Sequence, residues 1–360
     1  MKKIVIVAGD KSADIYGGLL CEKIQEKFDG VEIFSFGGNN LAKSSHQVIN
    51  LLDHSVSGLV EVISSIKKLF DIFKRMIEEI NRIKPDLIIL MDFPDFNLKL
   101  AKTLNKKYPL FYYISPQLWA WRKSRINLIK KYVDKMVVIF KFEEDFYKKE
   151  NVDALYFGHP LLEMIKNKET EPKKIISFLP GSRKNEIKKH LPVMLETKKI
   201  LEKELKDFSF RIIRPDNIEE DFYKKLSPKI EITPHSYDRI KESAFIITCS
   251  GTATVEISIL EVPFLIIYKM NPLSWHILRR IVDTKFIGMV NILSGKKVIE
   301  ELIQEKANPK NIAKITLEAL KHTEKYQKIK EELKQVKSTM SPYGATDKFA
   351  DFIGQYLNLK

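Results

Sequence analysis

The sequence predicts an α/β protein made of two Rossmann-like domains, each with a parallel sheet covered by helices. Three observations predict this fold. The chain has 360 residues, more than one hydrophobic core usually serves, so two domains of about 150–200 residues are expected. Short apolar, β-branched runs alternate with amphipathic stretches, as in parallel α/β sheets. The alternation pauses at a polar, proline-containing segment, residues 164–174, and then restarts.

Each expected strand is a short apolar run between helical segments. In the first half these runs are residues 4–8, 31–36, 87–91, 110–114, 136–140 and 155–157. In the second half they are residues 175–179, 208–213, 230–233, 245–249 and 264–268. Between them, apolar residues recur at the spacing of one helix face, for example from Gly58 to Ile83. Helices at residues 312–320, 326–336 and 349–357 close the chain.

These elements set the expected domain boundaries. An N-terminal Rossmann-like domain should cover residues 1–165. A C-terminal Rossmann-like domain should cover residues 172–338 and bind the nucleotide. Residues 339–360 should form a terminal helix that packs back on an N-terminal domain, either its own or that of a second chain. Two such domains would face each other across a cleft, where parallel sheets commonly bind nucleotides.

Composition restricts the classes of function. Lys and Arg exceed Asp and Glu by 14, which favours an anionic partner, although a lysine-rich lineage would give the same excess. Cys21 and Cys249 have no metal-like or disulfide-like spacing, which is typical of a reducing, cytoplasmic compartment. No window approaches 18 uninterrupted apolar residues, and the run after Lys3 is too short for a signal peptide. No nucleic-acid-binding module is recognisable, so nucleic acid is not an expected partner.

Two carboxyl ends of first-half strands carry candidate functional residues. The first strand runs into Gly9-Asp10-Lys11-Ser12, a turn that could hold a phosphate or a sugar hydroxyl, with Ser12 as the expected N-cap. The alternative is a plain helix cap. The strand at 87–91 ends in Asp92, whose pKa beside apolar Phe93 could rise enough for a general base. A metal-binding acidic pair or an N-cap, with Asp95 as the better cap, are the alternatives.

Two second-half strands end in turns suited to phosphate. Arg183 follows a Gly-Ser turn, and a guanidinium binds phosphate oxygens bidentately. The segment 250–256, Ser-Gly-Thr-Ala-Thr-Val-Glu, opens a helix whose N-terminal N–H groups and dipole favour phosphate, while Glu256 could accept hydrogen bonds from ribose hydroxyls. An ordinary turn with a solvated arginine, and a carboxylate that merely complements the helix dipole, are the alternatives.

The chain resembles the lipid-A-disaccharide synthase family, whose members are GT-B glycosyltransferases. The resemblance runs nearly end to end and rests on eight strings in order. They are AGDKSAD at 8–14, VSGLVEV at 56–62, DFPDF at 92–96, YISPQLWAWR at 113–122, FGHP at 157–160, LPGSRKNEI at 179–187, SGTATVE at 250–256 and VNILSG at 290–295. Asp10 and Ala13 stand where the family usually has glutamate and glycine.

The resemblance implies an inverting transfer from UDP-2,3-diacylglucosamine to 2,3-diacylglucosamine 1-phosphate (lipid X), giving the β(1→6) disaccharide 1-phosphate and UDP. It implies that Asp92 is the catalytic base and that Asp10 and Ser12 face the acceptor. It also implies no cofactor or metal, because helix dipoles and basic side chains stabilise the departing diphosphate. The residues expected near the UDP are Arg183, Ser250, Gly251, Thr252, Thr254, Glu256, Asn291 and Gln304.

Acylated substrates imply peripheral docking on the cytoplasmic face of the inner membrane. The candidate contacts are Trp119–Arg122, the segment 272–280, and Leu59 with Val60, each with plain packing as the alternative. His159 could contact phosphate or be structural. Oligomeric state stays open, a homodimer included. The rival functions are a UDP-sugar 2-epimerase, another GT-B nucleotide-sugar enzyme, or a non-catalytic lipid or nucleotide carrier. A carrier would not need the base.

Overall fold

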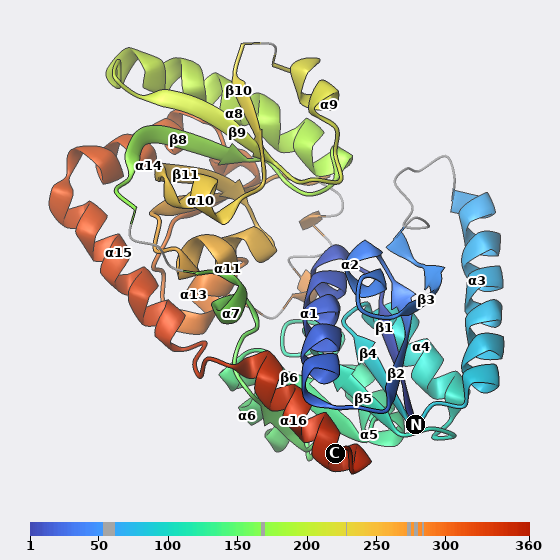
Figure 1. The fold of residues 1–360 in the computed structure, drawn as a ribbon. Coiled ribbons are helices and arrows are strands. Elements are labelled where there is room, and N and C mark those ends of the chain that lie inside the picture. The colour runs from blue at the N-terminus through green and yellow to red at the C-terminus, as the bar shows by residue number, and fades with distance from the viewer. Residues whose placement is uncertain (53–61, 167–169, 228, 272–274, 277–279, 283) are drawn as a thin grey trace. The chain divides into compact units, whose positions relative to one another are not determined.

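The computed structural model describes residues 1–52, 62–166, 170–227, 229–271, 275–276, 280–282 and 284–360. The chain forms two compact units (Figure 1). Unit 1 comprises Met1–Glu163 and Met340–Lys360, and unit 2 comprises Met164–Thr339. Each unit contains one sheet in which every described strand pair is parallel. The predicted α/β class with two parallel sheets is therefore confirmed.

Unit 1 holds a seven-stranded sheet of order β3-β2-β1-β4-β5-β6-β7. The strands are β1 (Lys2–Ala8), β2 (Val31–Gly37), β3 (His46–Asn50), β4 (Leu87–Met91), β5 (Leu110–Tyr113), β6 (Lys135–Val138) and β7 (Ala154–Tyr156). The helices are α1 (Lys11–Lys27), α2 (Asn39–Ala42), α3 (Val62–Ile83), α4 (Pro94–Leu104), α5 (Ile126–Tyr132), α6 (Lys141–Lys149), α7 (Leu161–Met164), which ends at the start of unit 2, and α16 (Ala345–Leu357). A 3₁₀ turn, Lys123–Arg125, precedes α5.

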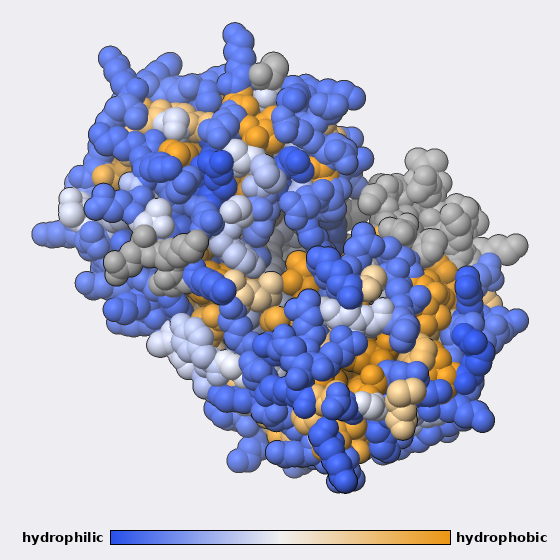
Figure 2. Space-filling model, viewed as in Figure 1, coloured by the Kyte–Doolittle hydropathy of each residue, from blue (hydrophilic) through white to orange (hydrophobic). Residues whose placement is uncertain are grey.

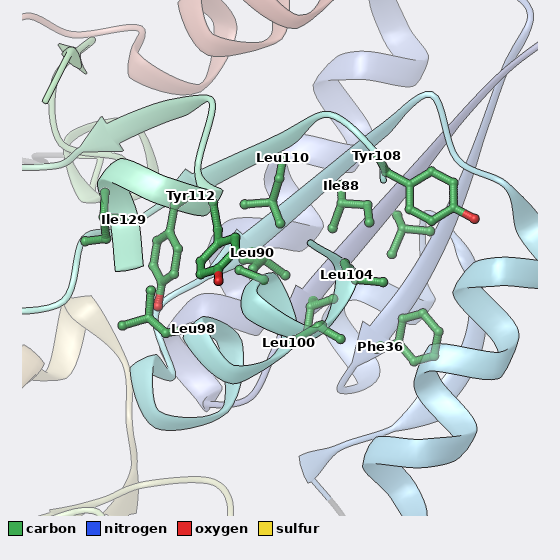
Figure 3. Packing of buried hydrophobic residues seen from close by; sticks show 14 of the residues in the cluster. Phe36, Ile88, Leu90, Leu98, Leu100, Leu104, Tyr108, Leu110, Tyr112 and Ile129 are labelled. Carbon is green, nitrogen blue, oxygen red and sulfur yellow. The ribbon is translucent and has the colours of Figure 1, made fainter. Parts of the chain in front are cut away.

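Alternate residues of these strands face opposite helical layers. On one face, Leu90 and Tyr112 pack with Leu98 and other residues of α3, α4 and α5 (Figure 3). On the other face, Phe111 lies against the rings of Phe352 and Tyr356 of α16. Both faces of the sheet are therefore buried, which explains the continuous apolar runs that predicted these strands.

The C-terminal helix α16 packs against α1, and the two lie side by side in Figure 1. Gly354 allows this approach, because a Cβ at that position would lie only 2.2 Å from Cζ of Phe28. Lys27 at the end of α1 adds ion pairs to Asp347 and Asp351. The last residues of the chain thus complete the hydrophobic layer of unit 1.

Unit 2 holds a six-stranded sheet of order β10-β9-β8-β11-β12-β13. Its strands are β8 (Lys173–Leu179), β9 (Ser209–Arg214), β10 (Glu231–Pro234), β11 (Ser243–Cys249), β12 (Phe264–Tyr268) and β13 (Glu301–Ile303). Its helices are α8 (Lys184–Glu204), α9 (Glu220–Lys224), α10 (Tyr237–Lys241), α11 (Thr252–Ile259), α13 (Met289–Ser294), α14 (Pro309–Lys321) and α15 (Thr323–Ser338), with a 3₁₀ turn at Gln304–Lys306. The core contains α8 and α14 against the sheet, while α11, α13 and α15 contact one another.

Two strands, β3 and β13, are absent from the sequence prediction. β3 lies at the sheet edge, and its His-Gln-Val-Ile-Asn sequence has mostly solvent-accessible side chains, so it lacks a continuous apolar run. β13 is an edge strand of three residues. The strand predicted over 110–114 ends one residue earlier, because Ile114 has a φ of 63° and cannot continue the extended chain.

Asp14 of α1 fixes the turn that follows β2, and we expect its loss to be costly. Its buried carboxylate accepts hydrogen bonds from the backbone N–H groups of Gly38 (2.6 Å), Asn40 (3.0 Å) and Leu41 (3.2 Å). Asp14→Ala leaves these donors without an acceptor and should lower the free energy of unfolding by about 3 kcal/mol. Denaturant titration measures this change. The exposed Asp29→Ala is the control, and equal midpoints for both variants would contradict the expectation.

Candidate functional site

The candidate catalytic residue, Asp92, lies where the strand order of unit 1 changes direction. β1 is flanked by β2 on one side and by β4 on the other, and Ala8 of β1 pairs with Met91 of β4. The turns after these two neighbouring strands therefore start side by side at the carboxyl edge of the sheet. Parallel sheets place ligands at such switch points. The structure brings Asp10, Ser12 and Asp92 into this one region.

The backbone around Asp92 is held in an uncommon conformation. Asp92 and Phe93 have φ values of 43° and 47°, in the left-handed region that costs a non-glycine residue about 1 kcal/mol or more. Two side chains stabilise this turn through the Asp92 carbonyl oxygen. Tyr112 Oη donates to it at 2.6 Å and Asn97 Nδ2 donates to it at 2.8 Å. Sequence reasoning missed both, because they lie on β5 and α4 and meet Asp92 only in the folded unit.

Burial, together with the carboxylate of Asp10, raises the pKa of Asp92 to about 8. The carboxyl group of Asp10 lies close enough for its charge to act on Asp92, and like charges this close disfavour ionisation of both. Asp10 also accepts a hydrogen bond from Ala13 N at 3.0 Å, so it is the N-cap of α1. The prediction that Ser12 is the N-cap is wrong, because α1 already begins at Lys11 and Ser12 lies in its first turn.

The raised pKa of Asp92 predicts a pH dependence. A base acts in its ionised form, so kcat/KM should rise about tenfold per pH unit below pH ~8 and level off above it. Asp10→Asn keeps a good N-cap but removes the neighbouring negative charge. It should therefore lower the pKa of Asp92 and move the midpoint of the rate profile to lower pH. A pH–rate profile of the wild type and of Asp10→Asn measures the shift. If the two midpoints are identical, the rise of kcat/KM with pH reports the ionisation of a group other than Asp92.

Two further residues shape the turn after β4. Phe93 covers Gly9, where a Cβ would lie 2.1 Å from the Phe93 ring, so the first turn requires glycine for this close contact. Asp95 does not cap α4, so the N-cap alternative does not hold for it. The structure places Phe93 at the N-cap position and leaves Asp95 exposed in the first helical turn. There Asp95 forms ion pairs with Arg122 (3.0 Å) and Arg125.

In unit 2, the turn after β8 presents a solvent-exposed arginine. Gly181 has a φ of 134°, and the backbone N–H of Ser182 donates to Glu186 Oε2 at 3.1 Å. The Arg183 side chain is 81% exposed and contacts Glu186 only at 3.4 Å. An exposed pair of this kind holds a guanidinium weakly. The guanidinium can therefore turn to a bound anion at little cost.

A buried histidine, His190 of α8, braces this turn. Its Nδ1 lies 2.9 Å from Pro180 O, and its Nε2 lies 3.0 Å from the backbone N of Lys269. Lys269 is the residue that follows β12. Burial lowers the pKa of His190, so the neutral ring donates from Nδ1 and accepts at Nε2. His190 thereby ties the turn after β8 to the segment after β12. Sequence reasoning missed this role, because a histidine inside a helical stretch carries no motif.

The predicted segment 250–256 forms the turn after β11 and the first residues of α11. Gly251 is the N-cap, and it and Thr252 are exposed at the helix start. Thr254 is buried and donates to Gly251 O at 2.7 Å, while Ser250 Oγ donates to Ile287 O at 2.9 Å. The Ser250 and Thr254 hydroxyls therefore make internal bonds that shape the turn. The exposed N-terminus of α11 is suited to an anion by its dipole.

Glu256 has a partner that the sequence did not reveal. His235, which follows β10, lies with Nε2 at 2.8 Å from Glu256 Oε2, and the Tyr237 ring packs edge-on against it. The pair is partly accessible at the carboxyl edge of the sheet. His235 lies two residues after the predicted strand 230–233, so a search of every strand end could have found it.

Asn291 and Gln304 are buried, and their amide groups bond to the protein itself. Asn291 Oδ1 accepts from Val298 N and Ile299 N at 2.7 and 3.0 Å, and its Nδ2 donates to Glu301 Oε1 at 2.8 Å. Gln304 Oε1 accepts a hydrogen bond from the backbone N–H of Met270 at 2.8 Å. These contacts support a role in bracing the loops, in which any effect on a bound nucleotide is indirect.

His159 has a structural environment. It is 2% exposed, and its Nδ1 accepts from Leu161 N at 3.1 Å. Its ring packs against Phe140 and Tyr16. Burial lowers the pKa of His159 to about 3, so the ring is neutral at physiological pH. A neutral, enclosed imidazole is a poor phosphate ligand, and the structural alternative therefore accounts for His159.

The candidate membrane contacts are only partly visible. Leu59, Val60 and residues 272–274 and 277–279 lie outside the described residues. Trp121 lies under the guanidinium of Arg122 at 4.4 Å. Of the helices the structure describes, none has an apolar stretch long enough to cross a bilayer. The face seen in Figure 2 is mainly hydrophilic, with hydrophobic areas interspersed.

Potential metal ligands do not gather anywhere in the described part of the chain. Within those ranges, no group of three or more His, Cys, Asp and Glu side chains is placed to hold a metal ion. The acidic side chains whose charges act on the candidate base are Asp10, which caps a helix, and Glu143.

A model of the lipid-A-disaccharide synthetase family matches residues 4–346. Curated relatives agree with it over nearly their whole length. The lipid-A-disaccharide synthase of Syntrophus aciditrophicus is 35% identical, with 97% of this chain and 96% of the relative covered. That of Persephonella marina is 35% identical, with 98% of each covered.

Solved structures of similar fold belong to several nucleotide-sugar proteins. The S. aureus MnaA–UDP co-structure has a TM-score of 0.69 at 16% identity and covers 100% of this chain and 98% of its own. The Neisseria meningitidis UDP-GlcNAc 2-epimerase has a TM-score of 0.66 at 11% identity and covers 98% and 100%. The glycosyltransferase of kitacinnamycin has a TM-score of 0.63 at 12% identity and covers 99% of each. At these identities the likeness extends to the fold alone.

Proposed function

The chain belongs to the lipid-A-disaccharide synthase family, and from this membership we propose its reaction. The enzyme joins UDP-2,3-diacylglucosamine to lipid X and yields the β(1→6)-linked disaccharide 1-phosphate and UDP. One observation carries the proposal beyond the family match. Asp92 stands at the strand switch point in a strained turn, with its pKa raised towards neutrality by burial and Asp10.

In the proposed reaction, ionised Asp92 accepts the proton of the 6-hydroxyl of lipid X. The hydroxyl oxygen forms a bond to the anomeric carbon of the donor while the bond from that carbon to the diphosphate oxygen breaks. UDP leaves with the bonding electrons, and the direct displacement inverts the configuration. The base and the positive groups act on charge that develops in the transition state, which is where stabilisation accelerates a reaction.

Unit 1 is the acceptor side and unit 2 the donor side in this proposal. The Arg183 guanidinium and the N-terminus of α11 at Gly251 and Thr252 would bind the diphosphate. The partly accessible Glu256 would bind ribose hydroxyls. Asp10 and Ser12 would contact lipid X beside the base. Asn291 and Gln304 would act by holding the donor loops in place.

Acylated substrates require the enzyme to work at a membrane surface. We place it at the cytoplasmic face of the inner membrane as a peripheral protein, and the net charge of +14 supports attraction to an anionic leaflet. All the residues named in the proposed reaction belong to a single chain. The proposal is therefore compatible with a homodimer and does not require one.

The test is release of UDP from UDP-2,3-diacylglucosamine in detergent micelles, with and without lipid X, with the product identified by mass spectrometry. Acceptor-dependent UDP release with a tetra-acyl disaccharide product is the expected result. The rival is a UDP-sugar 2-epimerase, favoured only by the shared fold. An epimerase would convert UDP-GlcNAc without lipid or acceptor, and that outcome would replace the proposal. Donor binding without turnover would indicate a carrier.

A further inference from the structure

Glu143 is a buried carboxylate that the proposed reaction does not use. It lies in the first turn of α6 and is 2% exposed. Its Oε1 accepts hydrogen bonds from Ser115 Oγ at 2.7 Å and from Trp119 Nε1 at 3.2 Å, and its Oε2 accepts from Phe140 N at 3.3 Å. Burial raises the pKa of Glu143 to about 7. Burying a charge costs free energy unless the charge is paired or hydrogen-bonded, and these three donors offset that cost for the Glu143 carboxylate.

The segment that Glu143 holds, residues 115–121 (the Trp119 loop), begins beside Asp92. It follows β5, whose Tyr113 accepts a backbone hydrogen bond from Asp92 N at 3.1 Å. The charge of Glu143 is itself close enough to contribute to the raised pKa of Asp92. The start of the Trp119 loop and the candidate base therefore share one small region of unit 1.

The Trp119 loop is fastened to two helices. Towards α6, Tyr147 Oη donates to Pro116 O at 3.4 Å, one turn after Glu143. Towards α4, the residue that follows the loop, Arg122, binds Asp95 at 3.0 and 3.2 Å. Asp95 lies in the first turn of α4, three residues after Asp92. The loop therefore runs from a carboxylate on α6 to a carboxylate at the start of α4, the helix that follows Asp92.

We propose that Glu143 is a positioning residue for the transfer reaction. By fixing the indole N–H of Trp119, it sets the plane of a half-buried ring and the course of the Trp119 loop, which orients the acceptor sugar at Asp92. This inference rests on the proposed function. The ring of Phe142 packs edge-on against Trp119 at 5.1 Å and supports the same orientation. Small displacements of a reacting group matter, since about 1 Å can cost about 100-fold in rate.

Glu143→Gln tests the proposal with little change in shape. A glutamine has one acceptor oxygen, so its amide N–H₂ must face either the N–H of Phe140 or that of Trp119, neither of which can accept a hydrogen bond. We expect kcat for disaccharide formation to fall about 10- to 100-fold. The donor KM and the UDP affinity measured by calorimetry should stay within about twofold, because residues of unit 2 are not touched. A variant that is merely less stable would also lose apparent kcat, because less of it is folded. The rate is therefore expressed per binding-competent enzyme, from the stoichiometry of UDP binding in the calorimetry.

Glu144→Gln is the matched control. Glu144 is the next residue on α6 and ion-pairs with Lys141 at the surface, so we expect no change in kcat. Trp119→Phe is the second variant, and it removes the N–H donor with the five-membered ring of the indole while keeping a six-membered aromatic ring. If Glu143 acts through Trp119, the double variant should lose little more activity than Glu143→Gln alone.

The outcomes separate this inference from the proposed function. A wild-type enzyme that forms no disaccharide would remove the proposed function and this inference with it. A fully active Glu143→Gln variant would overturn the inference alone. So would multiplicative losses in the double variant, or a loss of UDP affinity equal to the loss of kcat. A selective loss of kcat with non-additive variants is the supporting result.

Discussion

Asp92→Asn is expected to lower the rate of disaccharide formation by about 10²- to 10⁴-fold, the usual contribution of a general base. An amide of the same shape cannot take up the proton of the acceptor hydroxyl. The strained turn should survive the change, because Tyr112 and Asn97 bind the backbone carbonyl oxygen of Asp92 and not its side chain. UDP affinity should therefore stay unchanged. Single-turnover transfer and calorimetry with UDP measure the two quantities.

Asp153→Asn is the control for this variant. Asp153 lies just before β7 in the same unit, and its side chain is 69% exposed and ion-pairs with Lys135. Exposed pairs contribute little to stability, so we expect activity within about twofold of wild type. Full activity in Asp92→Asn would leave the reaction class standing and transfer the role of base to another carboxylate, with Asp10 the first to test.

The predictability of the fold follows from how each strand is buried. Strands enclosed on both faces, such as β4 and β11, are continuous apolar runs and were predicted within a residue or two. β3 and β13 both lie at sheet edges. β3 has mostly polar residues and β13 has only three residues, so hydrophobic periodicity could not predict either strand. The start of α1 was misjudged by two residues because Asp10 and Ser12 are both good N-caps, and only the fold selects between them.

The residues of the candidate site likewise fall into two groups: those whose position follows from local sequence, and those whose role depends on tertiary contacts. Asp92 follows a strand directly and Arg183 lies in the short turn after one, so their place at a sheet edge could be inferred from local sequence. Glu143 could not be inferred, because its meaning depends on Ser115 and Trp119, which lie on another element. Asn291 and Gln304 were expected near UDP by resemblance alone. Their amides turn out to serve neighbouring backbone groups, a contact that depends on tertiary structure.

Arg183→Ala is expected to reduce kcat/KM by about 10²- to 10³-fold, the loss found when a single stabilising group is removed from a developing negative charge. The variant should remain folded, because Arg183 is 81% exposed and makes only a 3.4 Å contact with Glu186. Arg183→Lys should recover part of the loss, since it keeps the charge but not the planar fork that binds two phosphate oxygens. Steady-state kinetics with varied donor measures the effect.

The neighbouring cation Lys184 provides the control that separates a specific diphosphate contact from general charge. Lys184 is also exposed, but its ammonium group lies over the Phe222 ring at 5.8 Å. If Arg183 binds the diphosphate directly, Lys184→Ala should stay within about threefold of wild type, the scale of a screened surface charge. Equal losses in the two variants would show that the donor responds only to the net positive charge of unit 2. The assignment of the turn after β8 as the diphosphate site would then fail, because nothing else in that turn distinguishes the two cations.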